Sequence, residues 1–390
     1  MKLNYDRLGK HIRQVDIRNI DGKETNLLGV SVQKKFIPSI ANTVGTDFTK
    51  YKIVKKGQFT YIPDTSRRGD KIGIALLLDY ESGIVSNIYT VFEVIDTNKL
   101  LPEYLMLWFM RPEFDRYARF KSHGSVREIF DWEQLCNVEL PVPPIEKQRN
   151  IVKAYKTITD RIALKQRINE NLAKQCSIDY VKTLKGYTTE DENLPPSWRK
   201  GNIGDYCDVK SGYAFKSEWW TDKGYKVIKI ANISKNSVEL DECDCVQLEN
   251  AVKAQNFMVQ SGDLLIAMTG ATIGKIGLVP LTSEKIVVNQ RVGKFFLGNH
   301  PIEKVPFLFS TLLYSKVACY LQPDGTAGSA QDNLSADDIK NISIVMPDEK
   351  TILDFNNYHI PHIKTIINNN AEIRRLKSML DIMLQILSSR

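Results

Sequence analysis

Residues 140–155, LPVPPIEKQRNIVKAY, pass from an extended segment straight into a helix, and this junction decides the fold. Proline has no backbone N–H and pushes the residue before it away from helical conformations, so LPVPP is predicted to be extended. The same change of character comes again in residues 344–358, IVMPDEKTILDFNNY. Pro143 and Pro347 lie 204 positions apart, just over half of the 390-residue chain. The chain is therefore predicted to build one strand-to-helix junction twice.

The segments that lead into the two junctions also match each other. Residues 124–143, GSVREIFDWEQLCNVELPVP, align without a gap on residues 328–347, GSAQDNLSADDIKNISIVMP. Each begins with Gly-Ser and ends in proline, and their apolar residues fall in step. The tripeptide KIG at 71–73 meets KIG at 275–277 at the same offset. A period this long excludes a solenoid, so the pattern indicates duplication of a whole domain together with its helix.

The repeat divides the chain into four segments. We predict a first globular domain at residues 1–143, a helical region at 144–187, a second globular domain at 188–347 and a second helical region at 348–390. The boundary between the copies falls in the polar stretch GYTTEDENLPPS, residues 186–197, which ends near a double proline. With 43% hydrophobic residues, a chain of this length can bury more than one core.

The globular segments are predicted to be mixed α/β structure rich in strands. IGIALLL and GIVSNIYTVFEVI in the first segment, and DLLIAM and KIVVNQRVGKFFL in the second, are β-branched or alternating runs. Residues 102–120 and 305–321 each read as one helix with an apolar face. The predicted fold class is α+β, with two tandem mixed α/β domains and two long helices.

Each helical region carries seam residues that step by three and four positions, which is typical of a coiled coil. Lys165 and Asn169 interrupt the first seam, and Asn370 and Lys377 interrupt the second. A polar seam residue lowers stability while it specifies register and partner. Packing of each helix on its own domain alone is the open alternative. The predicted seam residues are Ile158, Ile162, Asn169 and Leu172 in the first helix, and Ile366, Asn370, Ile373 and Leu380 in the second.

Each helical region is further expected to consist of a short helix followed by a long one. Thr157 and Asp160 have the residue types and spacing that cap the start of a helix. Pro361 stands near the matching position of the second copy, where proline disfavours a continuous helix. Asp348 occupies the place of a helix N-cap at the second junction.

With these features in view, the chain resembles the specificity subunit of type I restriction–modification systems. The residues that carry the resemblance are VPPIEKQRNIV at 142–152, LPPSWRKGNIGDYCDVKSGYAF at 194–215 and GDLLIAMTGATIGKIGLV at 262–279. The second junction, MPDEKTILDF, departs from the pattern because it lacks the Pro-Pro and Gln-Arg elements. The resemblance implies two target recognition domains, each followed by a helical region. It also implies that the long helices pair as an antiparallel coiled coil with a pseudo-twofold internal repeat.

The same resemblance implies recognition of a bipartite target in double-stranded DNA, one half by each globular domain. It implies partnership with two modification subunits, which methylate adenine, and with restriction subunits, which cleave unmodified DNA. This chain would then perform no chemistry and bind no cofactor. S-adenosylmethionine, ATP and magnesium are expected on the partner subunits.

The motifs of common catalytic and metal sites are not matched in this sequence. GATIGK at 270–275 resembles the end of a phosphate loop, but Ile276 replaces the required Ser or Thr, so a glycine-rich turn is predicted. His359 and His362 share one helical face but lack a third ligand in sequence, so surface histidines and no metal site are predicted. Two other classes stay open. One is a stand-alone DNA-modifying enzyme with degenerate motifs, and the other is a non-DNA adaptor with two binding domains on a coiled-coil spacer.

DNA contacts are expected in loops that gather arginine, lysine and carboxamide side chains, because these groups bond base edges and phosphates. Net charge alone does not locate them, since the basic excess lies in residues 144–187, with 10 Lys and Arg against 4 Asp and Glu. The candidates in the first half are Arg67, Arg68, Lys71, Arg119, Lys121 and Arg127. The candidates in the second half are Tyr213, Lys216, Gln290, Arg291 and Gln331.

The expected location is the cytoplasm, with no membrane association. The six cysteines are scattered, as is usual for reduced thiols, and the sequence begins with the polar stretch MKLNYDRLGKHIRQ. No apolar run reaches the length of a membrane span.

Overall fold

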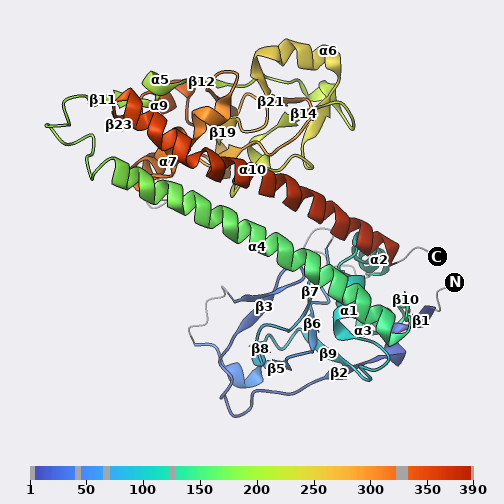
Figure 1. Ribbon diagram of the computed structural model, residues 1–390. Helices are drawn as coiled ribbons and strands as arrows, with labels where there is room; N and C mark the ends of the chain where they lie inside the picture. Colours follow the sequence, from blue (N-terminus) through green and yellow to red (C-terminus); the bar gives the residue numbers. More distant parts are fainter. Residues whose placement is uncertain (1–4, 40–44, 65–70, 123–127, 322–332, 388–390) are drawn as a thin grey trace. The chain divides into compact units, whose positions relative to one another are not determined.

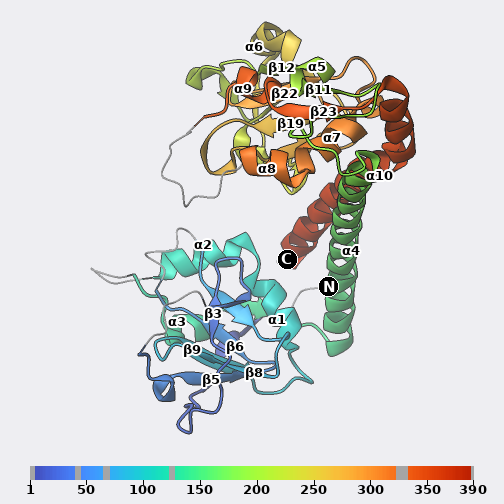
Figure 2. The same ribbon diagram turned by 90° about the vertical axis from the view of Figure 1, so that its left-hand side faces the viewer.

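The computed structural model describes residues 5–39, 45–64, 71–122, 128–321 and 333–387 (Figure 1 and Figure 2). The chain forms two compact units, one of residues 1–160 with 378–390 and the other of residues 161–377. Two long helices, α4 (Ile145–Thr183) and α10 (Glu349–Ile386), each contribute residues to both units.

The first unit is built on a four-stranded antiparallel sheet in the order β2-β9-β6-β7. Its strands are β2 (Ile12–Val15), β9 (Thr90–Val94), β6 (Phe59–Tyr61) and β7 (Ile74–Leu76). Phe59 and Phe92 stack across β6 and β9 with ring centroids 4.8 Å apart, and the edge of Phe109 packs on both rings. These three rings are fully buried, so they form the centre of this core.

Shorter elements surround this sheet. Strand pairs are β1 (Tyr5–Arg7) with β10 (Glu139–Pro141), β3 (Leu28–Val30) with β4 (Phe36–Pro38), and β5 (Lys52–Lys55) with β8 (Ser82–Val85). The helices are α1 (Pro102–Phe109), α2 (Pro112–Lys121) and α3 (Trp132–Cys136), with short 3-10 turns at Leu8–Lys10 and Phe48–Lys50. Leu384 and Leu387 near the end of the chain pack into the same core as these helices.

The second unit contains two larger sheets. One has the order β12-β22-β19-β20-β16-β15 and the other β13-β17-β14-β21-β18. The first comprises β12 (Asp208–Ser211), β22 (Val292–Phe296), β19 (Leu264–Ala267), β20 (Ile276–Leu278), β16 (Asn236–Val238) and β15 (Ile233–Ser234). The second comprises β13 (Trp220–Thr221), β17 (Asp244–Val246), β14 (Tyr225–Ile228), β21 (Ile286–Val288) and β18 (Met258–Val259).

A separate strand pair joins β11 (Arg199–Asn202) to β23 (Ser343–Met346). The helices of this unit are α5 (Ile203–Tyr206), α6 (Leu248–Ala251), α7 (Val305–Leu313), α8 (Ser315–Leu321) and α9 (Ala336–Lys340). Short 3-10 turns lie at Ser217–Trp219, Ile230–Asn232, Val252–Phe257, Gly270–Thr272 and Pro301–Glu303.

The duplication predicted from the sequence is visible in the strand order. Strands β2-β9-β6-β7 of the first copy have the same order as β12-β22-β19-β20 of the second. In both copies an antiparallel strand pair, β1 with β10 or β11 with β23, brings the start of the domain to the strand before the long helix. The predicted fold class is therefore confirmed.

The prediction of one helix at residues 102–120 and one at 305–321 is wrong, because each segment forms two helices. Arg111 adopts an extended conformation with ψ 138°, as expected for a residue before proline, and Pro112 then starts α2. In the second copy the break falls at Tyr314, with ψ 130°, between α7 and α8. Proline explains the first break, and nothing in the sequence marked the second.

The expected short helix followed by a long one is also wrong in both copies. α4 runs through Thr157 without interruption, and α10 runs through Pro361. Proline inside a helix costs about 3 kcal/mol or more. The buried residues Phe355, Ile363 and Ile366 on either side of it pack into the second core, and this burial outweighs the lost hydrogen bond.

Within the second unit the two long helices run antiparallel. Arg161 of α4 contacts Glu372 of α10, and Cys176, further along α4, contacts His359, which comes earlier in α10. The antiparallel pairing of the helices is thus established by the contacts of this unit alone.

A buried carboxamide attaches each long helix to the globular part of its own copy. Gln148 of α4 is fully buried, accepts from the Leu101 N–H at 2.9 Å and donates to two carbonyl groups. Asn356 of α10 accepts from the Phe307 N–H at 2.8 Å. Leu101 is the N-cap residue of α1, and Phe307 lies in the first turn of α7, where backbone N–H groups have no intrahelical acceptor. The second junction lacks the Gln-Arg element but keeps this function with Asn356.

Candidate nucleic-acid interface

Two backbone contacts of the first unit lie beside the segments that carry half of its predicted DNA contacts. Asp64 and Ile129 form an antiparallel bridge, and the Phe130 N–H donates to the Pro63 carbonyl at 2.9 Å. These residues flank segments 65–70 and 123–127. Among the predicted contacts, Arg67, Arg68 and Arg127 belong to those segments and lie outside the described residues.

The other candidates of the first unit surround α2. Lys71 is exposed, and its neighbour Ile72 donates its N–H to Asp115 of α2 at 3.2 Å. Arg119 in the last turn of α2 pairs with Glu128 at 2.8 Å, so a phosphate group would compete with this carboxylate. Lys121 ends the helix with its ammonium 5.7 Å from the ring centre of Phe120, which is 81% exposed.

A buried ion pair, missed in the sequence, holds α2 in place. Lys34 Nζ lies 2.7 Å from Asp115 Oδ1 and also donates to the Phe109 carbonyl. Burial lowers the pKa of Lys34, and the nearby Asp115 carboxylate acts in the opposite direction. Removing either partner would leave a buried charge uncompensated, which is strongly destabilising. No local sequence pattern links these two residues, since Lys34 lies in the turn between β3 and β4 and Asp115 lies in α2.

In the second unit, hydrogen bonds join the segments that carry Tyr213, Gln290 and Arg291. The Gln290 N–H donates to the Tyr213 carbonyl at 2.9 Å, and the Tyr213 N–H donates to the Val288 carbonyl at 2.9 Å. A Cβ atom on Gly212 would collide with that Val288 carbonyl, so this close approach requires glycine. Gln290 and Arg291 are both exposed at this turn.

The same turn borders a second pair of loops. The Met268 N–H donates to the Arg291 carbonyl at 3.0 Å, and the Leu334 N–H donates to the Met268 carbonyl at 2.8 Å. Thr269 and Asn333 then form an antiparallel bridge, as Asp64 and Ile129 do in the first unit. Gln331 lies outside the described residues, two positions before Asn333.

An aromatic cluster with lysines over its rings lies beside Tyr213. Trp219 stacks on Tyr213 with ring centroids 6.4 Å apart and an interplanar angle of 15°. Lys216 Nζ lies 5.6 Å and Lys253 Nζ 4.2 Å from the centre of the Trp219 ring. The sequence reasoning missed Trp219 and Lys253, although SEWW directly after Lys216 contains two adjacent tryptophans. Rings next to cations suit both stacking on bases and attraction to phosphates.

The predicted seam residues lie on the faces of the long helices that pack inward. Ile162, Ile366 and Ile373 are buried, and Leu172 is half-buried against the second core. Ile158 and Leu380, which belong to the first unit, are half-buried.

A polar network occupies the middle of this seam in the second unit. Asn169 donates to Asn370 at 2.7 Å and accepts from Asn369 at 2.8 Å. Lys165 donates to Asn369 at 2.9 Å and pairs with Glu372 at 2.7 Å. The amide groups of the two helices hydrogen-bond to one another, so a shift of register would leave several of them unpaired.

Lys377 and Arg374 of α10 face the globular part of the second unit. Lys377, which the spacing had suggested as a seam residue, pairs with Glu239 at 3.1 Å. Arg374 bonds Asp241 and Glu284, with 2.6 Å between Nη1 and Glu284 Oε2. The hydrogen bonds that Arg374 donates to Glu284 and Asp241 raise its pKa. These contacts orient α10 on the domain that precedes it.

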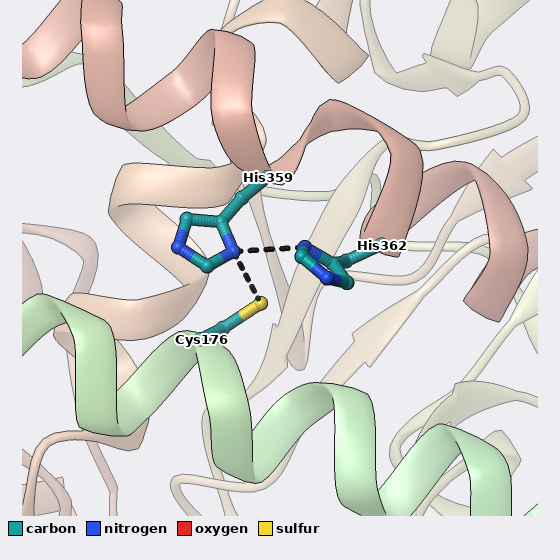
Figure 3. A group of neighbouring side chains, drawn as sticks. All are labelled: Cys176, His359 and His362. Atoms are coloured by element: carbon teal, nitrogen blue, oxygen red, sulfur yellow. Dashed lines mark hydrogen bonds between the residues drawn. The ribbon is translucent and has the colours of Figure 1, made fainter.

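The expectation of surface histidines at 359 and 362 is wrong for His359, which is 1% exposed. The third group that the sequence lacked is supplied by Cys176 of α4, which meets both histidines of α10 (Figure 3). Burial and the neighbouring His362 lower the pKa of His359 to about 4. Burial raises the pKa of the Cys176 thiol to about 12.

GATIGK forms the glycine-rich turn that was predicted, with a 3-10 turn at Gly270–Thr272 leading into β20. Asp348 caps α10, accepting from the Thr351 N–H at 2.9 Å, as its position in the sequence suggested. Among the helices of the described residues, none is both long and apolar enough to cross a membrane.

Comparison with known proteins finds one family that matches both copies of the repeat. The family model described as the type I restriction modification DNA specificity domain matches residues 13–174 and again residues 195–375. The MjaVIII specificity subunit of a type I restriction enzyme from Methanocaldococcus jannaschii is 23% identical over 244 residues, covering 60% of this chain and 56% of the relative. The MjaIX specificity subunit of the same organism is 24% identical over 323 residues, covering 75% of this chain and 69% of the relative.

The match to the MjaVIII subunit thus spans little more than half of that protein's length. Among solved structures, the S subunit of a type I restriction-modification system from M. genitalium has the same fold, with a TM-score of 0.56. It is 13% identical, and the match covers 100% of this chain and 97% of that one. The resemblance predicted from the sequence is confirmed by the two family matches. Since these matches together take in most of its residues, the chain belongs to the family of type I restriction modification DNA specificity domains.

Proposed function

We propose that this chain is the DNA-reading subunit of a type I restriction–modification system and that it recognises a bipartite target. Each globular half would read one part of the sequence. The observation that carries the proposal is the double family match, with one match on each copy of a repeated sheet. Each copy has a bridge at an equivalent place beside the sheet that both copies share, Asp64 with Ile129 in the first and Thr269 with Asn333 in the second.

The chemistry of the candidate surfaces supports this role. The exposed Gln290 and Arg291 have the carboxamide and guanidinium groups that bond adenine and guanine edges in the major groove. Lys216 and Lys253, held over the Trp219 ring, are suited to phosphate contacts that fix orientation but carry no sequence information. In the first half, Lys71, Arg119 and Lys121 offer the equivalent cations around α2.

The remaining parts of the system would lie on other chains. We propose that two modification subunits bring S-adenosylmethionine and the methyl-transfer site, and that restriction subunits bring ATP, magnesium and the nuclease. This chain would direct them to the target, contribute no catalytic residue and act in the cytoplasm, where the DNA is. The names of its relatives, which are specificity subunits of restriction enzymes, support this division of labour.

Expression with cognate modification subunits in a methylation-free host, followed by mapping of methylated adenines, tests the proposal. We expect two short specified sequences separated by unspecified base pairs. A single uninterrupted motif would contradict the assignment of one half-site to each copy. Methyl transfer by the purified chain alone would instead support a stand-alone enzyme. Absence of salt-sensitive DNA binding in the assembled complex would support a non-DNA adaptor.

A further inference from the structure

Three side chains with metal-binding chemistry meet between the two long helices of the second unit. Cys176 projects from α4, and His359 and His362 project from α10, with one donor atom of each lying within 4.8 Å of the others. His359 Nδ1 lies 3.4 Å from Cys176 Sγ and 2.9 Å from His362 Nδ1. Figure 3 shows both contacts reaching the same ring nitrogen. The proposed function assigns no role to this group.

Hydrogen bonding alone satisfies this arrangement poorly. Cys176 and His359 are 0% and 1% exposed, so solvent does not compensate their polar atoms. His359 Nδ1 has either one proton or one lone pair, yet it has two polar neighbours. A cation between the three donor atoms would instead use a lone pair of each.

Two of the three donor-atom separations are close to those around a tetrahedral ion, and the third, between Cys176 and His362, is at most 4.8 Å. Zinc bonds of about 2.0–2.1 Å to nitrogen and about 2.3 Å to sulfur place adjacent donors about 3.3–3.6 Å apart in a tetrahedron. The observed 3.4 Å between sulfur and nitrogen meets this, and the 2.9 Å between the nitrogens needs only a small rotation of one ring. His359 and His362 are spaced to share one helical face, which is why both rings reach the same point.

A carboxylate lies behind one of the two histidines. Asp179 Oδ2 lies 3.7 Å from Nε2 of His359, the ring nitrogen on the side away from the cluster. Gln175 and Lys182 bond Asp179 at 2.8 and 3.2 Å and fix its position. A carboxylate behind a ligating imidazole is the common second shell of zinc sites.

A groove borders the cluster on the side of His359. This groove of about 420 Å³ between α4 and α10 is lined by Asp179, Tyr358 and His359, among others. Phe355, which also lines this groove, packs on the His359 ring with ring centroids 4.4 Å apart. Cys176 and His359 are themselves buried, and the groove lies beside the cluster at His359.

We propose that Cys176, His359 and His362 bind one zinc ion that fastens α4 to α10 in the second unit, with water as the fourth ligand. A thiolate and two neutral imidazoles are a donor set that zinc favours. With the thiolate and Asp179 both charged, the two positive charges of the ion are balanced locally. The ion would act as a structural clasp on the helix pair.

The test uses the full-length chain, stripped with a chelator and titrated with Zn²⁺ against a chromophoric competitor, and separately with Co²⁺. We expect one equivalent of zinc per chain and a thiolate-to-cobalt charge-transfer band. Cys176→Ser should abolish the band and weaken zinc binding by about 100-fold or more. Asp179→Asn should keep the band and weaken binding by about 10-fold, as is typical of an outer partner. Cys319→Ser and His300→Gln, two exposed positions elsewhere in the same unit, are the matched controls and should change neither.

Thermal unfolding with and without zinc gives a second readout. Zinc should raise the Tm of the wild type and of Cys319→Ser but not of His362→Gln, because only a folded site binds the ion. If the folded wild type binds no stoichiometric zinc, the proposal is wrong. This outcome does not depend on how well the variants fold. Binding that survives Cys176→Ser but is lost on replacing Cys243 and Cys245 would also overturn it, by moving the ion to another pair of cysteines.

Discussion

The two copies of the repeat agree in their central sheets and differ at their edges. Strands β2-β9-β6-β7 and β12-β22-β19-β20 follow one order, and each copy enters its long helix from an antiparallel strand pair. The first copy adds small two-stranded pieces, whereas the second adds the five-stranded sheet, against whose core Trp219 and Trp220 pack. A shared frame with different edges is what two readers of unlike half-sites require.

The comparison also shows that the two copies keep the same structural roles but fill them with different residue types. Gln148 and Asn356 each fix a long helix to an N-terminal turn, although Asn356 lies one helical turn later than the position that the repeat assigns to Gln148. The short helices α3 and α9 are capped by Asp131 and Ser335, which the repeat aligns directly. Geometry is preserved, and several side chains can supply it.

The largest expected effect comes from exchanging one copy as a whole. Replacing residues 1–143 with the matching domain of a related subunit should change one half of the methylated sequence completely and leave the other half unchanged. The exchange is expected to be tolerated because the boundary lies directly after β10. Methylated-adenine mapping of the assembled complex measures the result, and the reciprocal exchange of residues 188–347 is the control. A change in both halves would break the idea of two independent readers.

A single contact in the second copy should have a smaller effect. Arg291→Ala should weaken specific DNA binding of the assembled complex by about 5- to 150-fold, because a bidentate base contact contributes about 1–3 kcal/mol. Folding should change by no more than about 0.5 kcal/mol, since the side chain is exposed. Equilibrium binding at fixed salt measures the loss.

Arg375→Ala on the exposed face of α10 is the matched control for charge. If Arg291→Ala and this control bind DNA equally well, the turn at residues 289–291 does not belong to the interface. If only the salt dependence changes and all sequences are weakened alike, Arg291 contacts phosphate and does not read a base.

The junction amides test whether the two copies are held in equivalent ways. Gln148→Leu and Asn356→Leu should each lower the free energy of unfolding by about 1–3 kcal/mol, because each leaves an N–H at a helix start, half-buried at Leu101 and buried at Phe307, without an acceptor. Denaturant unfolding measures the change, and Lys147→Ala, exposed beside Gln148, should be nearly neutral. A loss in one copy only would show that the second junction is held by other contacts.

Much of the frame was predictable from the sequence because its signals are local and repeated. Proline and Gly-Ser at a constant offset revealed the duplication, and the steps of three and four positions marked the buried faces of α4 and α10. What the sequence did not give depends on contacts between distant residues. Cys176 meets His359 across 183 positions, and Lys34 meets Asp115 across two elements. Lys377 fitted the seam spacing as well as its neighbours did, yet its side chain forms an ion pair with Glu239 of the globular domain.

The DNA contacts illustrate the same limit. Residue type selected Tyr213, Lys216, Gln290 and Arg291, and the fold brings their segments together. Trp219 and Lys253 join them only through packing on the second sheet, so composition alone could not include them. The predicted contacts of both copies remain predictions until binding is measured.

The smallest expected effect lies at the aligned caps, and it tests the comparison most closely. Asp131 accepts from the Gln134 N–H at 2.8 Å, and Ser335 accepts from the Asp338 N–H at 3.0 Å. Loss of an N-cap costs about 1 kcal/mol, because a backbone N–H at the helix start loses its acceptor. Asp131→Ala and Ser335→Ala should therefore each lower the free energy of unfolding by about that amount.

The exchanges Asp131→Ser and Ser335→Asp are the sharper variants, because both residue types cap helices equally well. Each should stay within about 0.5 kcal/mol of the wild type in denaturant unfolding. If the alanine variants lose stability and the exchanges do not, the two positions have the same capping role and their side chains are interchangeable. A large loss for Ser335→Asp alone would mean that the adjacent carboxylate of Asp338, which bonds the Ser335 N–H and hydroxyl, does not tolerate a second negative charge. In that case the caps would be equivalent in backbone geometry but not in electrostatics.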